Sequence, residues 1–221
     1  MSCEEKMNKI IVPAVIAKSQ GELEGILDKI GEHAGLIQLD IMDGKFVPNQ
    51  SLHFDFRLPN GKHVYEAHLM VDDPDSWIES FGKKVDTVIV HFESPSFSSQ
   101  TIRSIKALGK KAALALNPET DIEKVADYLE DLDQVLIMTV HPGFYGSPFL
   151  PDVMGKIAKL RRMKPDMDIE VDGGIAPETI GRVNEAGANL FVSGSYLVKS
   201  DNLQDRINAL YQMIRDEETP V

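Results

Sequence analysis

Short apolar segments recur along the chain, and a polar turn follows each of them. They are rich in β-branched residues, and eight can be recognised: Ile10–Ile16, Leu36–Ile41, Val64–Met70, Thr87–His91, Lys111–Leu116, Gln134–Thr139, Asp168–Val171 and Asn189–Ser193. Most are continuously apolar rather than alternating. This pattern favours strands of a parallel sheet that is covered on both faces.

Amphipathic segments with helical spacing lie between the apolar ones. They include Gln20–Ile30, Pro74–Phe81, Ser98–Leu108, Ile122–Leu129, Phe149–Met163, Pro177–Ala186 and Leu203–Ile214. Eight strand–helix repeats predict an α/β fold, a (β/α)8 TIM barrel with a parallel eight-stranded barrel. No linker divides the chain, so we expect a single domain over residues 1–221. The longest connection is the loop Gly44–Asn60, which we expect to lie near one end of the barrel.

Composition narrows the classes of partner. The chain has 221 residues and a formal net charge of −12, which argues against binding nucleic acid through clustered cations. No apolar run approaches the roughly 18 residues of a membrane span, and Cys3 is the only cysteine. We therefore expect a cytoplasmic protein with no membrane or nucleic-acid partner. A small anion remains a possible ligand, because backbone N–H groups can bind phosphate without any cation.

One acid stands out within the apolar stretch Leu36–Gly44. Asp40 follows buried-type residues, and a buried carboxylate needs a partner or a use. Polar residues lie at or near the ends of several predicted strands: Asp40, His68, His91, Asn117, His141 and Asp172. Each alone can be a turn or structural residue. The strand ends of such a barrel converge on one face, where these acids and histidines would form a single site.

Glycine-rich turns follow the last three predicted strands. They are Gly143–Ser147, Asp172–Gly174 and Ser193–Ser195. Glycine lets a backbone approach a ligand closely, and barrels commonly bind phosphate in the loops after strands seven and eight. Tight turns would explain any one of them, but three in succession favour a phosphate site. The candidate phosphate-binding residues are Gly143, Gly146, Ser147, Gly173, Gly174, Gly194 and Ser195.

Three methionines fall at or just beyond predicted strand ends: Met42, Met70 and Met138. Methionine is a common core filler. The functional alternative is an apolar collar that keeps water from a carbanion-like intermediate, and it makes these residues candidate substrate contacts.

Five motifs together resemble the ribulose-phosphate 3-epimerase family. They are Asp40-Ile41-Met42-Asp43-Gly44-Lys45-Phe46-Val47-Pro48-Asn49, His68-Leu69-Met70-Val71, Leu116-Asn117-Pro118-Glu119-Thr120, Met138-Thr139-Val140-His141-Pro142-Gly143-Phe144 and Val171-Asp172-Gly173-Gly174-Ile175. They keep the family's order and extend over most of the chain. The resemblance implies a barrel enzyme that inverts C3 of a phosphorylated ketose, interconverting D-ribulose 5-phosphate and D-xylulose 5-phosphate. It also makes a homo-oligomer plausible.

The resemblance assigns roles to the strand-end residues. Asp40 and Asp172 would be the two proton-transfer groups on opposite faces of the substrate, with an enediolate between the two steps. A divalent metal held by Asp40, His68, Asp172 and a second histidine would stabilise that enediolate. His68 would also lie beside the substrate.

The sequence departs from the family pattern at three positions. Gln38 replaces the second metal histidine, Ala14 replaces a first-strand serine that contacts substrate, and His141 stands where the family often has Asn, Asp or Glu. Two histidines would suit Zn or Fe, whereas Gln38 with two acids and one histidine leans toward Mn or Mg. Alternatively no metal binds and Gln38 donates an N–H to the enediolate oxygen. His141 is a further conceivable ligand.

Other functions are left open at this point. A hexulose 6-phosphate 3-epimerase of the allulose 6-phosphate type would use the same chemistry in a reshaped pocket. A catalytically impaired sugar-phosphate binding protein would keep the phosphate loops without turnover. A related barrel decarboxylase would need an Asp-x-Lys pattern, and Met42 stands at the Lys position.

Overall fold

A closed parallel barrel forms the centre of the molecule. The computed structural model describes residues 7–59, 61, 63–144 and 146–215. Within them the barrel strands are β1 (Ile10–Val15), β2 (Leu36–Asp43), β4 (Val64–Met70), β5 (Thr87–His91), β6 (Lys111–Leu116), β7 (Gln134–Met138), β8 (Asp168–Asp172) and β9 (Leu190–Ser193). Neighbours along the chain pair in parallel from β4 to β9, and β1 pairs with both β9 and β2. This last pairing closes the barrel, so the predicted fold class is confirmed.

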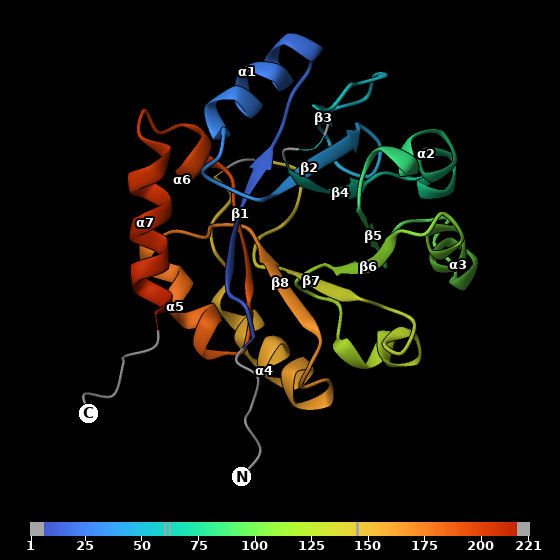
Figure 1. Ribbon diagram of the computed structural model, residues 1–221. Helices are drawn as coiled ribbons and strands as arrows, with labels where there is room; N and C mark the ends of the chain where they lie inside the picture. Colours follow the sequence, from blue (N-terminus) through green and yellow to red (C-terminus); the bar gives the residue numbers. More distant parts are fainter. Residues whose placement is uncertain (1–6, 60, 62, 145, 216–221) are drawn as a thin grey trace.

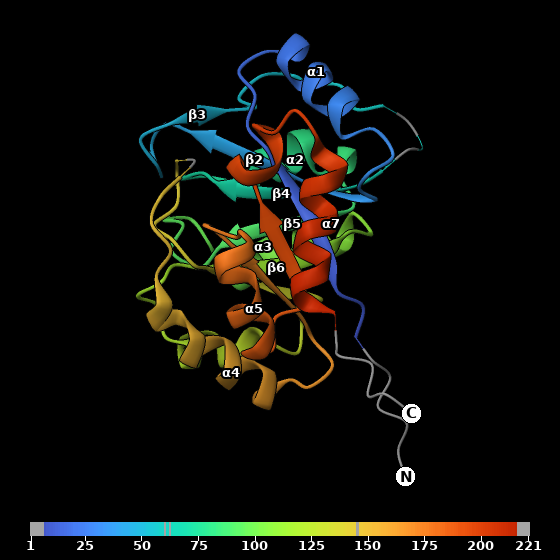
Figure 2. The same ribbon diagram turned by 90° about the vertical axis from the view of Figure 1, so that its left-hand side faces the viewer.

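Helices surround the strands (Figures 1 and 2). They are α1 (Gln20–Ile30), α2 (Pro74–Phe81), α3 (Ser99–Ala107), α4 (Met154–Met163), α5 (Pro177–Glu185), α6 (Ser195–Val198) and α7 (Leu203–Ile214), with 3-10 helices η1 (Gly82–Lys84), η2 (Ile122–Tyr128) and η3 (Pro151–Val153). Side-chain caps fix several starts: Ser19 accepts a hydrogen bond from the Glu22 N–H, and Asp73 accepts one from the Ser76 N–H.

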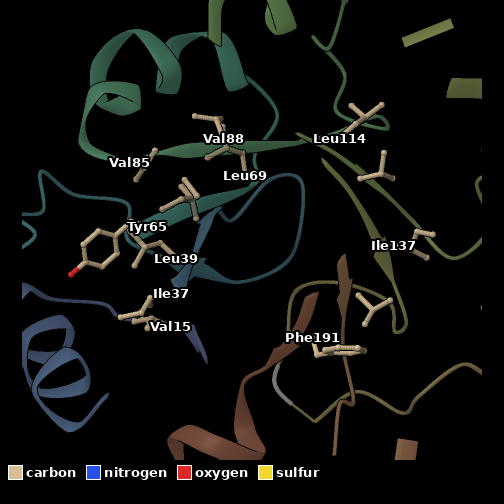
Figure 3. Packing of buried hydrophobic residues seen from close by; sticks show 14 of the residues in the cluster. Val15, Ile37, Leu39, Tyr65, Leu69, Val85, Val88, Leu114, Ile137 and Phe191 are labelled. Atoms are coloured by element: carbon tan, nitrogen blue, oxygen red, sulfur yellow. The ribbon is translucent and has the colours of Figure 1, made fainter. Parts of the chain in front are cut away.

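Alternation along each strand divides the side chains between two cores. Ile37 and Leu39 of β2 face outward, where they lie near Val15 and Tyr65 in an apolar layer that continues around the barrel to Phe191 (Figure 3). Because successive side chains of a strand point to opposite faces, Gln38 and its neighbour two residues on, Asp40, share the barrel interior. The outward layer supplies most of the apolar burial. The interior combines smaller apolar clusters with buried polar groups.

A short antiparallel strand extends one side of the barrel. Strand β3 (Gln50–Ser51) pairs with Met42 and Asp43, so β2 runs beyond the predicted end at Ile41. Asp40, which the sequence places near the strand end, therefore lies well inside β2. The loop Gly44–Asn60 is also partly structured, since Phe56 within it is fully buried.

The other differences from the sequence-based elements are local. Segment Ile122–Leu129 forms the 3-10 helix η2 instead of an α-helix, and Phe149–Met163 begins with η3 before α4 starts at Met154. Cys3, Tyr145 and the acidic end 216–218 lie outside the described residues. In the described part of the chain, no helix is both long and apolar enough to cross a membrane.

Candidate active site

A small cavity of about 120 Å³ opens at the carboxyl ends of the strands. The predicted residues that line it are Asp40, Met42, Met70, Met138, Gly143, Gly146, Ser147, Asp172, Gly173, Gly174, Gly194 and Ser195. Acids, methionines and glycine loops thus share one cavity. His68 lies below its surface and is fully buried.

Two acids meet above His68 at the base of this cavity. Asp40 comes from β2 and Asp172 from β8, and strands β1 and β9 separate these two in the barrel. The Nδ1 atom of His68 lies 3.5 Å from Asp40 Oδ1 and 3.3 Å from Asp172 Oδ2. The barrel therefore brings two carboxylates from distant strands to one imidazole.

Gln38 links the same two acids from beneath. Its Nε2 donates to Asp40 Oδ1 and to Asp172 Oδ2, each at 2.8 Å, and lies 3.4 Å from His68 Nδ1. Both N–H hydrogens are used by carboxylates. Its Oε1 is buried and has no hydrogen-bond partner in the structure. In this arrangement Gln38 has no N–H left for a substrate oxygen.

A second histidine fixes the far side of His68. His68 Nε2 and His91 Nε2 lie 2.9 Å apart and share one hydrogen, and His91 Nδ1 lies 3.2 Å from Glu93 Oε2. Because Glu93 accepts the Nδ1–H of His91, the bare Nε2 of His91 accepts from His68. The Glu93 carboxylate is itself held by the Asn117 N–H at 2.9 Å and by the Thr120 hydroxyl. These hydrogen bonds from Glu93 through His91 to His68 leave the Nδ1 atom of His68 facing the two acids.

Burial and charge shift the pKa values of these groups in opposite directions. Burial raises the pKa of Asp40, although hydrogen bonds from His68 and Gln38 act against it. Burial alone would lower the pKa of His68, but its hydrogen bonds to Asp172 and Asp40 outweigh this and raise it to about 9. Burial lowers the pKa of His91 to about 4. The pocket floor thus pairs a cationic His68 with a neutral His91.

Sequence reasoning missed a second polar layer deeper in the barrel. Gln134 Nε2 donates to Glu170 Oε2 at 2.5 Å and lies 3.4 Å from Glu66 Oε2. Burial raises the pKa of Glu66, and burial together with the Glu66 carboxyl raises that of Glu170. An amide bridge between two acids therefore occurs twice inside the barrel. The two-residue spacing from Glu66 to His68 and from Glu170 to Asp172 was a readable signal.

Other predicted residues lie around the cavity. His141 is exposed and pairs with Glu119, with 3.4 Å between His141 Nδ1 and Glu119 Oε1, so it does not join the central group in this structure. The loop Gly44–Asn60 reaches the far side of the mouth, where Asn49 Nδ2 donates to the Gly143 carbonyl at 3.0 Å. Ala14 lines the cavity and is paired in register with Gln38 across β1 and β2. The two main departures from the family pattern are therefore neighbours.

The Asp40–His68–Asp172 group could hold a divalent cation. Each residue offers one donor atom, and the three atoms lie within 4.8 Å of one another. One imidazole nitrogen and two carboxylate oxygens are ordinary ligands for such an ion. The unpartnered Gln38 Oε1 is one further oxygen close to the group.

Fold and site together define a barrel enzyme with paired acids above a histidine and glycine loops around a ligand cavity. The family model described as the ribulose-phosphate 3 epimerase family matches residues 10–198. The chain belongs to this family and is an isomerase of the epimerase type that acts on carbohydrates.

Similar proteins agree along most of the chain. The ribulose-phosphate 3-epimerase of Eremothecium gossypii is 34% identical over 94% of this chain and 94% of its own length. That of Bacillus subtilis is 43% identical over 73% of this chain and 79% of its own. Among solved structures, a 3-hexulose-6-phosphate synthase superposes with a TM-score of 0.66 at 18% identity, covering 93% of this chain and all of the other. At that identity the likeness concerns the fold alone.

Proposed function

We propose that this protein interconverts D-ribulose 5-phosphate and D-xylulose 5-phosphate, with Asp40 and Asp172 as the two proton-transfer groups. The observation that carries this is the meeting of two carboxylates from well-separated strands at one cavity floor. Inversion of a carbon beside a carbonyl needs one group to take the proton and another to return it from the opposite side. The relatives' name, ribulose-phosphate 3-epimerase, supports a ribulose phosphate as substrate and C3 as the inverted carbon.

The steps use the chain's own residues. One carboxylate removes the C3 proton from one face of the bound ketose, and the electron pair moves into the adjacent carbonyl to give an enediolate. The other carboxyl group then donates its proton to C3 on the opposite face, and the electron pair returns to re-form the carbonyl. His68 and Gln38 hold both acids in place through the contacts described above. A later exchange of protons with water restores the starting charges.

The cavity walls suit the remaining parts of the substrate. Gly173, Gly174 and Gly194 lie in the loops after β8 and β9, where barrels commonly bind phosphate through backbone N–H groups. Met42, Met70 and Met138 add apolar surface to the cavity lining. We propose that they limit the access of water to the enediolate.

We further propose that a divalent cation, with Mn or Mg favoured over Zn or Fe, is bound by Asp40, His68 and Asp172, with Gln38 Oε1 as a fourth donor. Such an ion would act as a Lewis acid toward the enediolate oxygens. The donor set of one nitrogen and several oxygens supports the harder ions. A metal-free reaction would require Gln38 to release one carboxylate and turn an N–H to the substrate.

Turnover of ribulose 5-phosphate in a coupled assay tests the proposal. Asp40→Asn and Asp172→Asn should each lower kcat by about 10²–10⁴-fold. Asp152→Asn changes an exposed acid of η3 in the same way and should leave turnover unchanged. Absence of wild-type turnover with every common divalent ion would refute the pentose phosphate reaction.

Isotope exchange separates two acids from one. In deuterated water each single variant keeps one functional carboxyl, so it should still exchange the C3 hydrogen of only one of the two epimers. The epimer that exchanges should differ between Asp40→Asn and Asp172→Asn. Exchange of both epimers by one variant would show that a single group serves both faces.

Two rivals predict other outcomes. Faster turnover of a ketohexose 6-phosphate than of the pentose would favour the hexulose phosphate reaction, which the small Ala14 at the cavity wall could accommodate. Binding without any exchange at C3 would favour a sugar-phosphate binding protein.

We also propose a single-domain, homo-oligomeric, cytoplasmic protein with no nucleic-acid or membrane partner. The single cysteine and the net charge of −12 support the compartment and the partners.

A further inference from the structure

The amide nitrogen of Gln38 lies among the donor atoms that would bind the metal. It is 2.8 Å from Asp40 Oδ1, 2.8 Å from Asp172 Oδ2 and 3.4 Å from His68 Nδ1. The three residues form the one candidate cation group found in the described part of the chain. A cation held by the same three atoms would need the space that this nitrogen fills.

Hydrogen-bond chemistry explains why the nitrogen points inward. An NH₂ group has two hydrogens and satisfies two carboxylates at once, whereas the amide oxygen in that place would face two anionic oxygens. The inward nitrogen has a cost, because Oε1 is left buried and unpartnered. Half a turn of the amide exchanges the two atoms. The oxygen then faces the two carboxylates, and a divalent cation bound between the oxygen and these carboxylates makes this orientation the favourable one.

We propose that the Gln38 carboxamide and a divalent cation compete for this position, so that Gln38 acts as an internal bridge in the metal-free protein and as a ligand in the loaded one. The inference rests on the proposed metal site. A histidine at position 38 could not bridge both acids from a single nitrogen, since each imidazole nitrogen carries at most one hydrogen. Gln in place of the family's histidine at position 38 therefore holds Asp40 and Asp172 together when no metal is bound. The same contact makes metal binding weaker, because the metal must displace it.

The variant Gln38→Glu separates the two roles. Glutamate keeps the length and one oxygen but replaces the bridging NH₂ by a second oxygen. We expect Mn²⁺ to bind about tenfold or more tightly to Gln38→Glu than to the wild type in calorimetric titrations, because a charged ligand is added and a competitor removed. In EDTA the Tm of Gln38→Glu should fall below that of the wild type, and Mn²⁺ should raise it by more than it raises the wild-type Tm.

Gln134→Leu is the control for a lost bridge. Gln134 also bridges two buried acids inside the barrel, Glu66 and Glu170, and the described residues form no candidate cation group there. Its replacement should lower the Tm in EDTA. Mn²⁺ should raise the Tm of this variant by no more than it raises the wild-type Tm. Equal Mn²⁺ affinity of Gln38→Glu and wild type, or a Tm of Gln38→Glu in EDTA equal to that of the wild type, would overturn the competition.

The wild type gives an independent measurement that does not depend on a variant's folding. The two side-chain N–H protons of Gln38 should exchange slowly with solvent in EDTA and faster when Zn²⁺ is bound, as followed by ¹⁵N NMR. Unchanged exchange in Zn²⁺-saturated protein would overturn the half turn of the amide. If neither wild type nor Gln38→Glu binds any divalent ion, the metal site itself fails, whatever the turnover assay shows.

Discussion

His91 determines which nitrogen of His68 faces the acids. Its Nε2 accepts from His68, and its ring also packs on Phe46 with 4.9 Å between centroids. Groups that orient a metal ligand typically contribute 10–100-fold to metal affinity. His91→Phe keeps a ring but loses the acceptor, so we expect Mn²⁺ affinity to fall by about that factor in calorimetric titrations.

A conservative variant serves as the control. The side-chain oxygen of His91→Gln can accept the same hydrogen bond from His68 and should recover part of the loss. Equal affinities of His91→Phe and His91→Gln would show that the ring matters only for packing.

For single residues, the sequence predicted which side chains belong to the candidate site, but not which of their atoms contact one another. Asp40, His68 and Asp172 follow from their places near strand ends. The Gln38 bridge and the link through His91 to Glu93 depend on distances across the barrel and on side-chain rotamers, which periodicity does not contain. Glu93 stands two residues after His91, in the turn after β5, and this spacing was the available signal.

Asp43 secures the turn after β2. Its Oδ1 accepts from the Lys45 and Phe46 N–H groups, and its Oδ2 accepts from the Asp72 N–H at 2.9 Å. Burial alone would raise its pKa, but these hydrogen bonds outweigh burial and hold the pKa below the ordinary value of 3.8. A depressed pKa means that the stabilisation is present above about pH 3.8 and is lost as the pH falls through the folded value.

Asp43→Asn should therefore destabilise the protein at neutral pH by about 1–2 kcal/mol, because an NH₂ group cannot accept the Asp72 N–H. The difference from the wild type in urea unfolding should shrink as the pH is lowered below about 4. A constant difference across this range would contradict the role of the charged carboxylate. Asp152→Asn again provides an exposed control.

The turn after β8 requires glycine at position 173. Gly173 has φ +117°, and a Cβ there would lie 2.3 Å from Val140 Cγ2. Gly173→Ala should cost about 1–3 kcal/mol in unfolding free energy and raise KM for the sugar phosphate. Gly25→Ala, on the exposed face of α1 with no atom near its added Cβ, should instead stabilise by about 0.5–1 kcal/mol. Similar effects of the two variants in urea unfolding would contradict this explanation.

Apolar runs located most strands because the outward face of each strand is apolar and packs beneath the helices. Strands β4, β5 and β6 and helices α1, α2 and α7 have the predicted bounds. The misses have local causes. Strand β3 has two residues and depends on pairing with β2, and α6 has only four residues, so neither has a detectable period.

Charge acts at the scale of the whole molecule. The protein carries a formal charge of −12, and no lysine or arginine is among the described residues that line the cavity. An anionic substrate thus approaches against a repulsive field that salt screens. We expect KM for the sugar phosphate to fall by about two- to threefold between low salt and 0.15 M, measured with coupling enzymes in excess at each salt concentration. A KM that rises with salt would indicate a cation at the phosphate that the cavity lining does not contain.

The pairing of Ala14 with Gln38 has a consequence for how this site could change. These positions are register partners where β1 and β2 close the barrel, so a change in the size of one side chain bears on the space left to the other. Ala14→Ser and Gln38→His should therefore show epistasis, and a double-mutant cycle on stability should give an interaction energy of about 0.5–3 kcal/mol. Such coupling would mean that Ala14 and Gln38 change together, because each single variant would be less stable than both the wild type and the double variant.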